Sequence, residues 1–177
     1  INGFLLAGLD QGIYKSTNNG DNWTDANNDL TRNLGITSFA YNGNHVFVLA
    51  FKLDFFTFRF SIVRGNSSGE NWTSIIDNTT LSFNNIINVG SDLFVSTQKD
   101  GILKSTNNGD NWEFVNNGLT NLSISSIKSS GTNLFASTLG GGVFMSSNNG
   151  TSWIAINNGL ARLTVLDIFL SNTRMFA

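Results

Sequence analysis

The sequence predicts an all-β protein made of a repeated unit, and three observations support this prediction. The element Ser-Thr-Asn-Asn-Gly-Asp-Asn-Trp occurs at 16–23 and again, unchanged, at 105–112, with weaker copies at 64–72 and 146–153. The glycine of this element recurs at intervals of 49, 40 and 41 residues, a period typical of one four-stranded unit repeated along a chain. The apolar runs between the copies are short and bounded by Gly and Asn, which favours strands over helices. The sequence therefore predicts a β-propeller of four-stranded antiparallel blades.

Each copy of this element, called the box below, belongs to a longer cassette. In the last copy an apolar strand at 134–138, a tight turn at 140–142 and a second strand at 143–146 precede the box, and a short strand at 154–156 follows it. Gly-Gly and Asn-Gly pairs supply the positive φ that tight hairpin turns require. An alternating run such as 123–127 supplies the fourth strand of a period. Because a four-stranded sheet cannot bury both of its faces alone, neighbouring blades must stack on each other.

The cassette boundaries predict one propeller segment with about four blades. These blades span approximately 1–31, 32–80, 81–120 and 121–163, and residues 164–177 either begin a further blade or close the first one. Counting strands, the chain opens with a turn at Asn2-Gly3 and the second strand of a blade at 4–9. We expect the segment to be part of a larger ring, completed by further blades of the same chain or by a second copy. A closed four-bladed ring is the alternative.

The box carries a family resemblance. Its pattern, Ser-x-Asn-x-Gly-x-x-Trp, resembles the Asp box, or bacterial neuraminidase repeat, of sialidase-like propellers, in which an Asp stands in place of the Asn. The surrounding cassette is similar to those of bacterial surface propellers, xyloglucanase-type glycosidases, sortilin-like receptors and photosystem II assembly factors. The resemblance covers nearly the whole chain. It implies a propeller fold, but it does not choose among the unrelated activities that this scaffold carries.

We interpret the box as a clip that holds a turn. A short polar side chain can bond to backbone N–H groups two residues on, the Gly adopts positive φ, and the Trp packs into the blade. A metal site is not predicted, because hard cations favour clustered carboxylates over amides and hydroxyls. The structural positions of the boxes are Ser16, Asn18, Gly20, Trp23, Ser67, Gly69, Trp72, Ser105, Asn107, Gly109, Trp112, Ser146, Asn148, Gly150 and Trp153.

One segment departs from the cassette. In the 49-residue interval, the run Phe51–Phe60 replaces the compact Gly turn, and its apolar alternation changes phase at Phe56, which predicts two lengthened strands meeting in a hairpin near 54–56. This hairpin and the post-Trp loops should share the face opposite the boxes, and in related enzymes that face holds the active site. Phe55 and Phe56 either grip a sugar ring or protein partner or cover a neighbouring blade. The candidate binding residues are Lys52, Asp54, Phe55, Phe56, Asp10, Lys99, Asp100 and Arg162.

Composition limits the possible partners and locations. The net charge is −2 and only 12% of the 177 residues are charged, which argues against nucleic acid and acidic membrane surfaces as partners. No apolar stretch approaches membrane-span length, so no direct membrane insertion is predicted. The polar, uncharged, cysteine-free repeats suit an extracellular or cell-surface protein, with any export signal upstream of Ile1.

The predicted function is a noncatalytic binding, adhesion or assembly module, with a glycan or a protein as partner and with no cofactor. The Tyr, Glu and Arg residues form no recognisable set of the kind that sialidase chemistry, as the resemblance implies it, would need. A segment of a glycoside hydrolase that uses two carboxylates is the alternative, with Asp10, Asp54 or Asp100 as its candidates. A protein-complex assembly factor is a further alternative.

Overall fold

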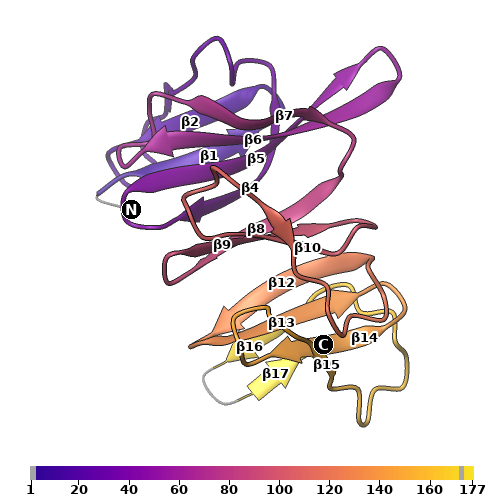
Figure 1. The fold of residues 1–177 in the computed structure, drawn as a ribbon. Coiled ribbons are helices and arrows are strands. Elements are labelled where there is room, and N and C mark those ends of the chain that lie inside the picture. Colours follow the sequence, from indigo (N-terminus) through magenta and orange to yellow (C-terminus); the bar gives the residue numbers. More distant parts are fainter. Residues whose placement is uncertain (1–2, 172–173) are drawn as a thin grey trace. The chain divides into compact units, whose positions relative to one another are not determined.

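The computed structural model describes residues 3–171 and 174–177, and all of the regular structure in this part of the chain is β (Figure 1). The sheets are antiparallel throughout. The predicted fold class, a partial propeller of about four blades, is confirmed. The chain divides into two compact units, residues 1–81 and 82–177, and each is described by itself below. Asn2, which the sequence places in a turn, lies outside the described residues.

The first unit holds two sheets. The strands are β1 (Leu5–Leu9), β2 (Gly12–Ser16), β3 (Thr24–Asp25), β4 (Gly35–Tyr41), β5 (His45–Asp54), β6 (Thr57–Asn66) and β7 (Thr73–Thr79). The first sheet has the order β1-β2-β3, and the second has the order β4-β5-β6-β7. Among the residues that the structure describes, the first sheet, called blade 1, therefore has no strand at the position that β4 occupies in blade 2.

The second unit holds two complete sheets and a hairpin. The strands are β8 (Phe83–Val89), β9 (Asp92–Thr97), β10 (Ile102–Ser105), β11 (Glu113–Phe114), β12 (Ile124–Ser130), β13 (Asn133–Thr138), β14 (Gly142–Ser146), β15 (Ile154–Ala155), β16 (Phe169–Ser171) and β17 (Arg174–Phe176). Strands β8 to β11 form blade 3 and β12 to β15 form blade 4, while β16 pairs with β17. This hairpin has the strand order that begins a blade. Closure of the first blade by residues 164–177 stays a prediction.

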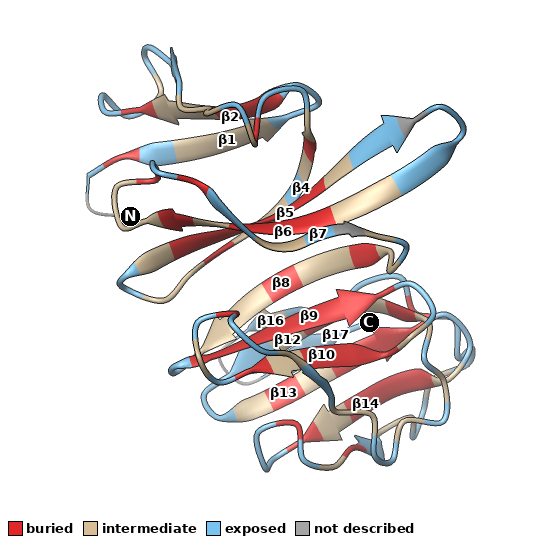
Figure 2. Cartoon of the chain, turned by 45° about the horizontal axis from the view of Figure 1, so that its top comes forward, coloured by how far each residue is buried: buried red, intermediate tan, exposed pale blue. Residues whose placement is uncertain are grey.

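The core lies on the middle strands of each blade, and Figure 2 shows these strands as the most continuously buried ones. Every residue of β9 is buried, and both of its edges are paired, one with β8 and the other with β10. In the first unit, Ile13 of blade 1 belongs to one cluster with Val48 and Val63 of blade 2. In the second unit, Phe94 of blade 3 belongs to one cluster with Ile127 and Phe144 of blade 4.

The box turns are held by side-chain hydrogen bonds. In blade 3 the Ser105 hydroxyl accepts a bond from the Gly109 N–H at 2.9 Å and donates to Asn107 Oδ1 at 3.0 Å. Asn107 Oδ1 also accepts a bond from the Asn111 N–H at 2.9 Å. The boxes of blades 1 and 4 repeat these three bonds with Ser16 and Asn18, and with Ser146 and Asn148.

Blade 2 holds its box turn differently. Here Asn66 Oδ1 accepts bonds from the N–H groups of Ser68 and Glu70, at 3.1 and 2.9 Å. The residue that clips this turn is therefore Asn66 and not Ser67. The reason lies one residue earlier: Gly65 stands where the other boxes have Ser, and a Cβ at Gly65 would come within 2.7 Å of the Trp72 ring. No hydroxyl fits at that position, so the neighbouring amide takes over the role.

The Trp that ends a box joins consecutive blades within a unit. Trp72 of blade 2 donates its indole N–H to the Ala26 carbonyl of blade 1 at 2.7 Å, and Trp153 of blade 4 donates to the Val115 carbonyl of blade 3 at 2.8 Å. In both cases the acceptor lies three residues after the Trp of the preceding blade, Trp23 or Trp112. The docked Trp72 and Trp153 are 4% and 3% exposed.

The clip predicts a measurable cost of removing one hydroxyl. Replacing Ser105 with Ala should lower the free energy of unfolding by about 1–3 kcal/mol, because the buried Gly109 N–H loses its acceptor. Urea unfolding followed by far-UV circular dichroism measures this difference. The matched control is Thr106→Ala, which removes a hydroxyl from the exposed neighbour. Equal losses in the two variants would contradict the clip.

Candidate functional site

A second set of asparagines shapes the turns on the face opposite the boxes. In blade 3, Asn116 Oδ1 accepts a bond from the Ile102 N–H at 2.8 Å, and its amide donates to the Asp100 carbonyl at 3.0 Å. Asn27 and Asn157 accept the equivalent bonds from Ile13 and Val143. Each amide lies against a turn glycine, and a Cβ at Gly101 would meet Asn116 Oδ1 at 2.1 Å. These blades therefore end in short turns.

Blade 2 lacks this asparagine, and its turn is lengthened instead. Ile76 stands four residues after the Trp, where Asn27 and Asn116 stand in other blades. The Ser61 hydroxyl donates a hydrogen bond to Asp77, the residue after Ile76. Without the short turn, β5 and β6 pair continuously from His45↔Asn66 to Asp54↔Thr57. The predicted hairpin is present, and residues 51–60 are called the finger below.

The finger has two chemically different faces. Because side chains alternate across a strand, the register places Phe51 and Leu53 on one face with Phe58 and Phe60. The rings of Phe51 and Phe58 have centroids 5.8 Å apart. The other face carries Lys52 opposite Arg59, and such a like-charge pair is unfavourable in an isolated hairpin. Figure 2 shows that the outer ends of β5 and β6 are exposed.

Two phenylalanines form the tip of the finger. Phe55 is 90% exposed and Phe56 is 99% exposed. Phe55 also has φ of +54°, at a loop position where hairpin turns usually carry Gly. A left-handed conformation costs an L residue roughly 1–2 kcal/mol. The tip therefore combines apolar exposure with backbone strain, and both are typical of functional sites.

The remaining predicted site residues are distributed over both units. Lys52, Phe55 and Phe56 lie together on the finger, and exposed Asp10 lies in the β1–β2 turn of the same unit. In the second unit, exposed Lys99 and half-buried Asp100 lie in the β9–β10 turn. Exposed Arg162 also lies in the second unit, in the loop after β15. The side chain of Asp54 lies outside the described residues.

Asp100 has one unusual feature. Its Oδ2 atom is enclosed and has no hydrogen-bond partner among the described residues. The backbone around it is satisfied, since its N–H donates to the Thr97 hydroxyl and its carbonyl accepts from Asn116. The backbone of Asp100 is therefore held in place, while one of its carboxylate oxygens is enclosed without a partner among the described residues.

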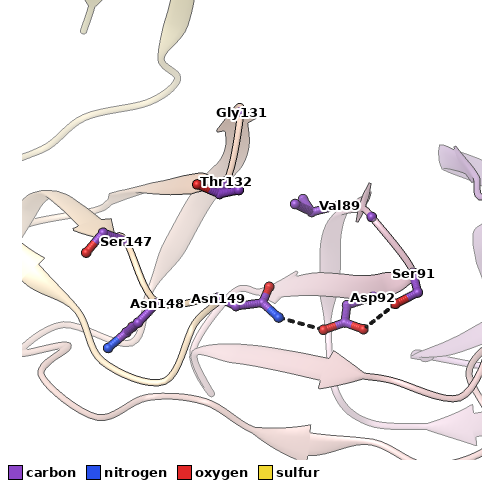
Figure 3. A pocket seen from close by; sticks show the side chains of 9 residues that line it. Val89, Ser91, Asp92, Gly131, Thr132, Ser147, Asn148 and Asn149 are labelled. Carbon is purple, nitrogen blue, oxygen red and sulfur yellow. Dashed lines mark hydrogen bonds between the residues drawn. The ribbon is translucent and has the colours of Figure 1, made fainter.

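A pocket in the second unit was not predicted from the sequence (Figure 3). It has a volume of about 420 Å³ and is lined by the β8–β9 and β12–β13 turns together with the box of blade 4. Asp92 lies on its wall, and the Asn149 amide donates to this carboxylate at 2.7 Å. Asp92 is the first residue of β9, and the residues around it in the sequence do not distinguish it. Only its contact with Asn149 of blade 4 identifies it as part of a pocket.

Asp92 forms a largely buried ion pair with Lys104, at 3.2 Å. Burial opposes ionisation of Asp92, but hydrogen bonds from Asn149, Lys104 and Ser91 outweigh it and lower the pKa of Asp92 below its usual value. The Lys104 ammonium also donates to the Asn149 carbonyl at 3.2 Å and lies over the Phe94 ring. Asp92 and Lys104 both belong to blade 3, and both contact Asn149 of blade 4. Through Asn149 the pair joins the two blades, and it is a structural element of the pocket wall.

The ion pair predicts a pH-dependent stability. Replacing Asp92 with Asn should cost about 1–3 kcal/mol at neutral pH, because charge-assisted bonds are lost. Since the pKa of Asp92 is lowered in the folded state, its contribution is present at neutral pH and disappears as pH falls through the folded-state value. The difference between wild type and variant should thus close below a pH of about 4.

Urea midpoints measured across the acid range test this prediction. The matched control is Asp21→Asn, the same change at an exposed box residue. A difference for Asp92→Asn that does not change between neutral and acid pH would contradict it.

The strained tip makes a second prediction about stability. Replacing Phe55 with Gly should raise the free energy of unfolding by up to about 1 kcal/mol, because Gly adopts positive φ without strain. The gain is smaller than the full strain energy, since Gly loses more backbone entropy on folding. The control is Phe56→Gly, since Phe56 is equally exposed but is not among the residues with positive φ. Thermal unfolding measures both variants. If Phe55→Gly is destabilised as much as Phe56→Gly, the strain is not real.

Comparison with known proteins identifies the fold of this chain but not its family. No family model matches the chain, and no curated protein matches it. Solved β-propeller structures do. A GH74 xyloglucanase from Xanthomonas campestris is matched over 90% of this chain and 29% of its own, with 16% identity and a TM-score of 0.67. The structure of YCF48 bound to D1 peptide is matched over 84% of this chain and 47% of its own, with 15% identity and a TM-score of 0.59.

A nidogen/laminin complex gives a third match, over 85% of this chain and 59% of the other, with 16% identity and a TM-score of 0.59. The chain thus spans less than two thirds of each of these relatives. Among the described residues, no helix could cross a membrane, and no group of three or more His, Cys, Asp or Glu is placed to hold a metal.

Proposed function

We propose that this chain is a noncatalytic binding module that contacts a protein partner through the tip of the finger. The observation that carries the proposal is the exposure of Phe55 and Phe56, at 90% and 99%. Large aromatic side chains are the usual anchors of protein interfaces, because they bury much area and lose little conformational entropy. A hairpin that keeps a strained Phe at its tip, where Gly would be easier, is explained by such a contact.

The faces of the finger define the chemistry of the partner. The apolar face presents Leu53 and Phe58, which are 57% and 52% exposed. The other face presents Lys52 opposite Arg59, whose mutual repulsion an acidic partner would relieve. The matching surface is an apolar hollow bordered by Asp or Glu side chains. A peptide segment or a protein loop can supply both features.

The structural comparisons support protein binding at the level of fold. Two of the matched structures, YCF48 with D1 peptide and the nidogen/laminin complex, contain a partner. The repeated box turns, with their Ser, Asn, Gly and Trp positions, support assignment to the sialidase-like Asp-box propellers. The role that we assign is adhesion or assembly on a bacterial cell-surface or secreted protein, for which the low charge is the support. Sugar stacking on the same phenylalanines is the glycan-binding form of this proposal.

A glycoside hydrolase segment is the second candidate. The likeness to the GH74 enzyme and the unpaired carboxylate oxygen of Asp100 favour it. Hydrolysis with two carboxylates needs the pair held at a defined separation. Asp10 and Asp100 belong to different compact units of the chain.

The test begins with peptides selected from a random phage-displayed library on the immobilised chain. We expect the selected peptides to combine apolar with acidic residues. The double variant Phe55→Ser/Phe56→Ser should weaken their binding by a factor of about ten or more, because each buried aromatic anchor contributes up to a few kcal/mol. Isothermal titration measures the affinities.

The matched control is Phe114→Ser, which removes a half-exposed Phe from β11 and should leave the affinity unchanged. Equal binding by wild type and the double variant would refute the role of the finger. Release of reducing sugar from xyloglucan, lost in Asp100→Asn, would replace the binding proposal with the hydrolase.

A further inference from the structure

Asn-Gly pairs recur along this chain, and the structure places them in different surroundings. The sequence contains seven of these pairs, and in six of them the structure describes both residues. An Asn followed by Gly is chemically labile, because Gly has no Cβ to keep its backbone nitrogen away from the Asn side chain. Attack by this nitrogen on the Asn Cγ requires that the Gly N–H be released and that the Asn Oδ1 take up negative charge. The bonds at these two atoms therefore decide which pairs react.

The pairs inside the boxes have the Gly N–H held. In each of them the Gly donates this N–H to the first Ser of its box at 2.9 Å. In blade 3 the bond joins Gly109 to Ser105 and is buried. It must break before the nitrogen can turn towards the Asn side chain, which leaves a buried donor without a partner. The protected pairs are Asn19-Gly20, Asn108-Gly109 and Asn149-Gly150.

The pairs that follow the boxes of blades 3 and 4 have neither atom held. Among the described residues, nothing accepts a bond from the N–H of Gly118 or Gly159. In the same part of the chain, no donor bonds to the side-chain oxygen of Asn117 or Asn158. Both asparagines are exposed. These pairs therefore give the reactivity of Asn-Gly in this fold without protection and without activation.

The pair Asn42-Gly43, in the β4–β5 turn, has an engaged side-chain oxygen. Asn42 Oδ1 accepts bonds from the N–H groups of Asn44 at 3.1 Å and of His45 at 2.9 Å. Two N–H donors on one carbonyl oxygen are the arrangement that stabilises an oxyanion in acyl transfer. No acceptor among the described residues bonds to the Gly43 N–H, and a Cβ at Gly43 would meet nothing within 4 Å. This pair thus combines an unheld nitrogen with an activated carbonyl group.

The β4–β5 turn is held in this conformation by further bonds. The Asn42 N–H donates to the His45 carbonyl at 3.3 Å, and the Tyr41 hydroxyl donates to the Gly43 carbonyl. Gly43 has φ of +96°, a conformation that Gly adopts at little cost. The two donors therefore stay directed at Asn42 Oδ1.

We propose that Asn42 is a site of spontaneous deamidation, at which the β4–β5 turn activates its own side chain. The Gly43 nitrogen loses its proton to solvent and attacks Asn42 Cγ, while negative charge develops on Oδ1 between the two donors. The side-chain nitrogen then takes a proton from solvent and leaves as ammonia, which gives a cyclic succinimide. Water opens this ring at either carbonyl, and the product is aspartate or isoaspartate. The reaction does not involve the finger or its partner.

The products alter the turn in two ways. Each of them adds one negative charge to a chain whose net charge is −2. Aspartate keeps the acceptor oxygen for Asn44 and His45, and bonds to a carboxylate are the stronger ones. Isoaspartate instead adds one methylene to the main chain between β4 and β5.

Peptide mapping of one aged sample tests the proposal, because all of the pairs lie in the same chain. The folded protein is incubated at neutral to mildly alkaline pH, and mass spectrometry follows the mass increase from –NH2 to –OH at each Asn. We expect Asn42 to convert about ten-fold or more faster than Asn117 and Asn158, since each oxyanion donor increases the rate. The asparagines of the boxes should convert most slowly. In chain unfolded by urea these differences should disappear.

The box serine gives a matched variant for the protected pairs. Ser105→Ala releases the Gly109 N–H, so Asn108 should convert faster in this variant. Asn19 and Asn149 keep their serines and should convert as in wild type. An unchanged rate at Asn108 would show that the Ser bond does not protect the pair.

The products identify the route. Digestion with a protease that cleaves before aspartate but not before isoaspartate should reveal both products at position 42, whereas direct hydrolysis of the side chain gives aspartate alone. Aspartate without isoaspartate therefore overturns the succinimide route and the role of Gly43. Conversion of Asn42 that is no faster than that of Asn117 in the folded chain overturns the proposed activation.

Discussion

The contact on which the blades depend is the indole N–H of a box Trp docked on a backbone carbonyl of the preceding blade. A buried carbonyl needs a hydrogen-bond donor, and a Trp that is 3–4% exposed supplies that donor together with a large apolar surface. The box places this ring by fixing the turn just before it, through the Ser105 and Asn107 bonds of blade 3 and their equivalents. The repeated letters of the sequence thus encode a contact between repeats as well as a turn within each one.

The same logic explains why the finger occurs in blade 2. In the other blades an Asn after the Trp reaches back to a turn glycine and closes the strand pair early. Blade 2 has Ile76 at that position, so its strands continue and end in Phe55 and Phe56. Losing one amide on one blade therefore changes a scaffold turn into a projecting surface. The scaffold is repeated and the surface that we assign to binding is not.

Much of the fold follows from the sequence because the repeat period, the short apolar runs and the glycines all predict the same blades. The finger follows as well, since its alternation changes phase where β5 meets β6. The role of Asn66 could not be assigned, because aligning the boxes pointed to Ser67, and only the structure shows that the Trp72 ring leaves no room for a side chain at Gly65 and that Asn66 holds the turn. The Asp92 pocket depends on Lys104 and Asn149 meeting across blades, which no spacing along the chain reveals.

Hydrogen exchange at the four indole N–H groups tests the central contact most directly. In a dilute sample of the chain, followed by nuclear magnetic resonance and assigned by single Trp→Phe variants, the docked indole protons of Trp72 and Trp153 should exchange slowly with solvent. The Trp23 proton should exchange rapidly under the same conditions. Equal, rapid exchange at Trp72, Trp153 and Trp23 would show that the blades are not joined through these hydrogen bonds.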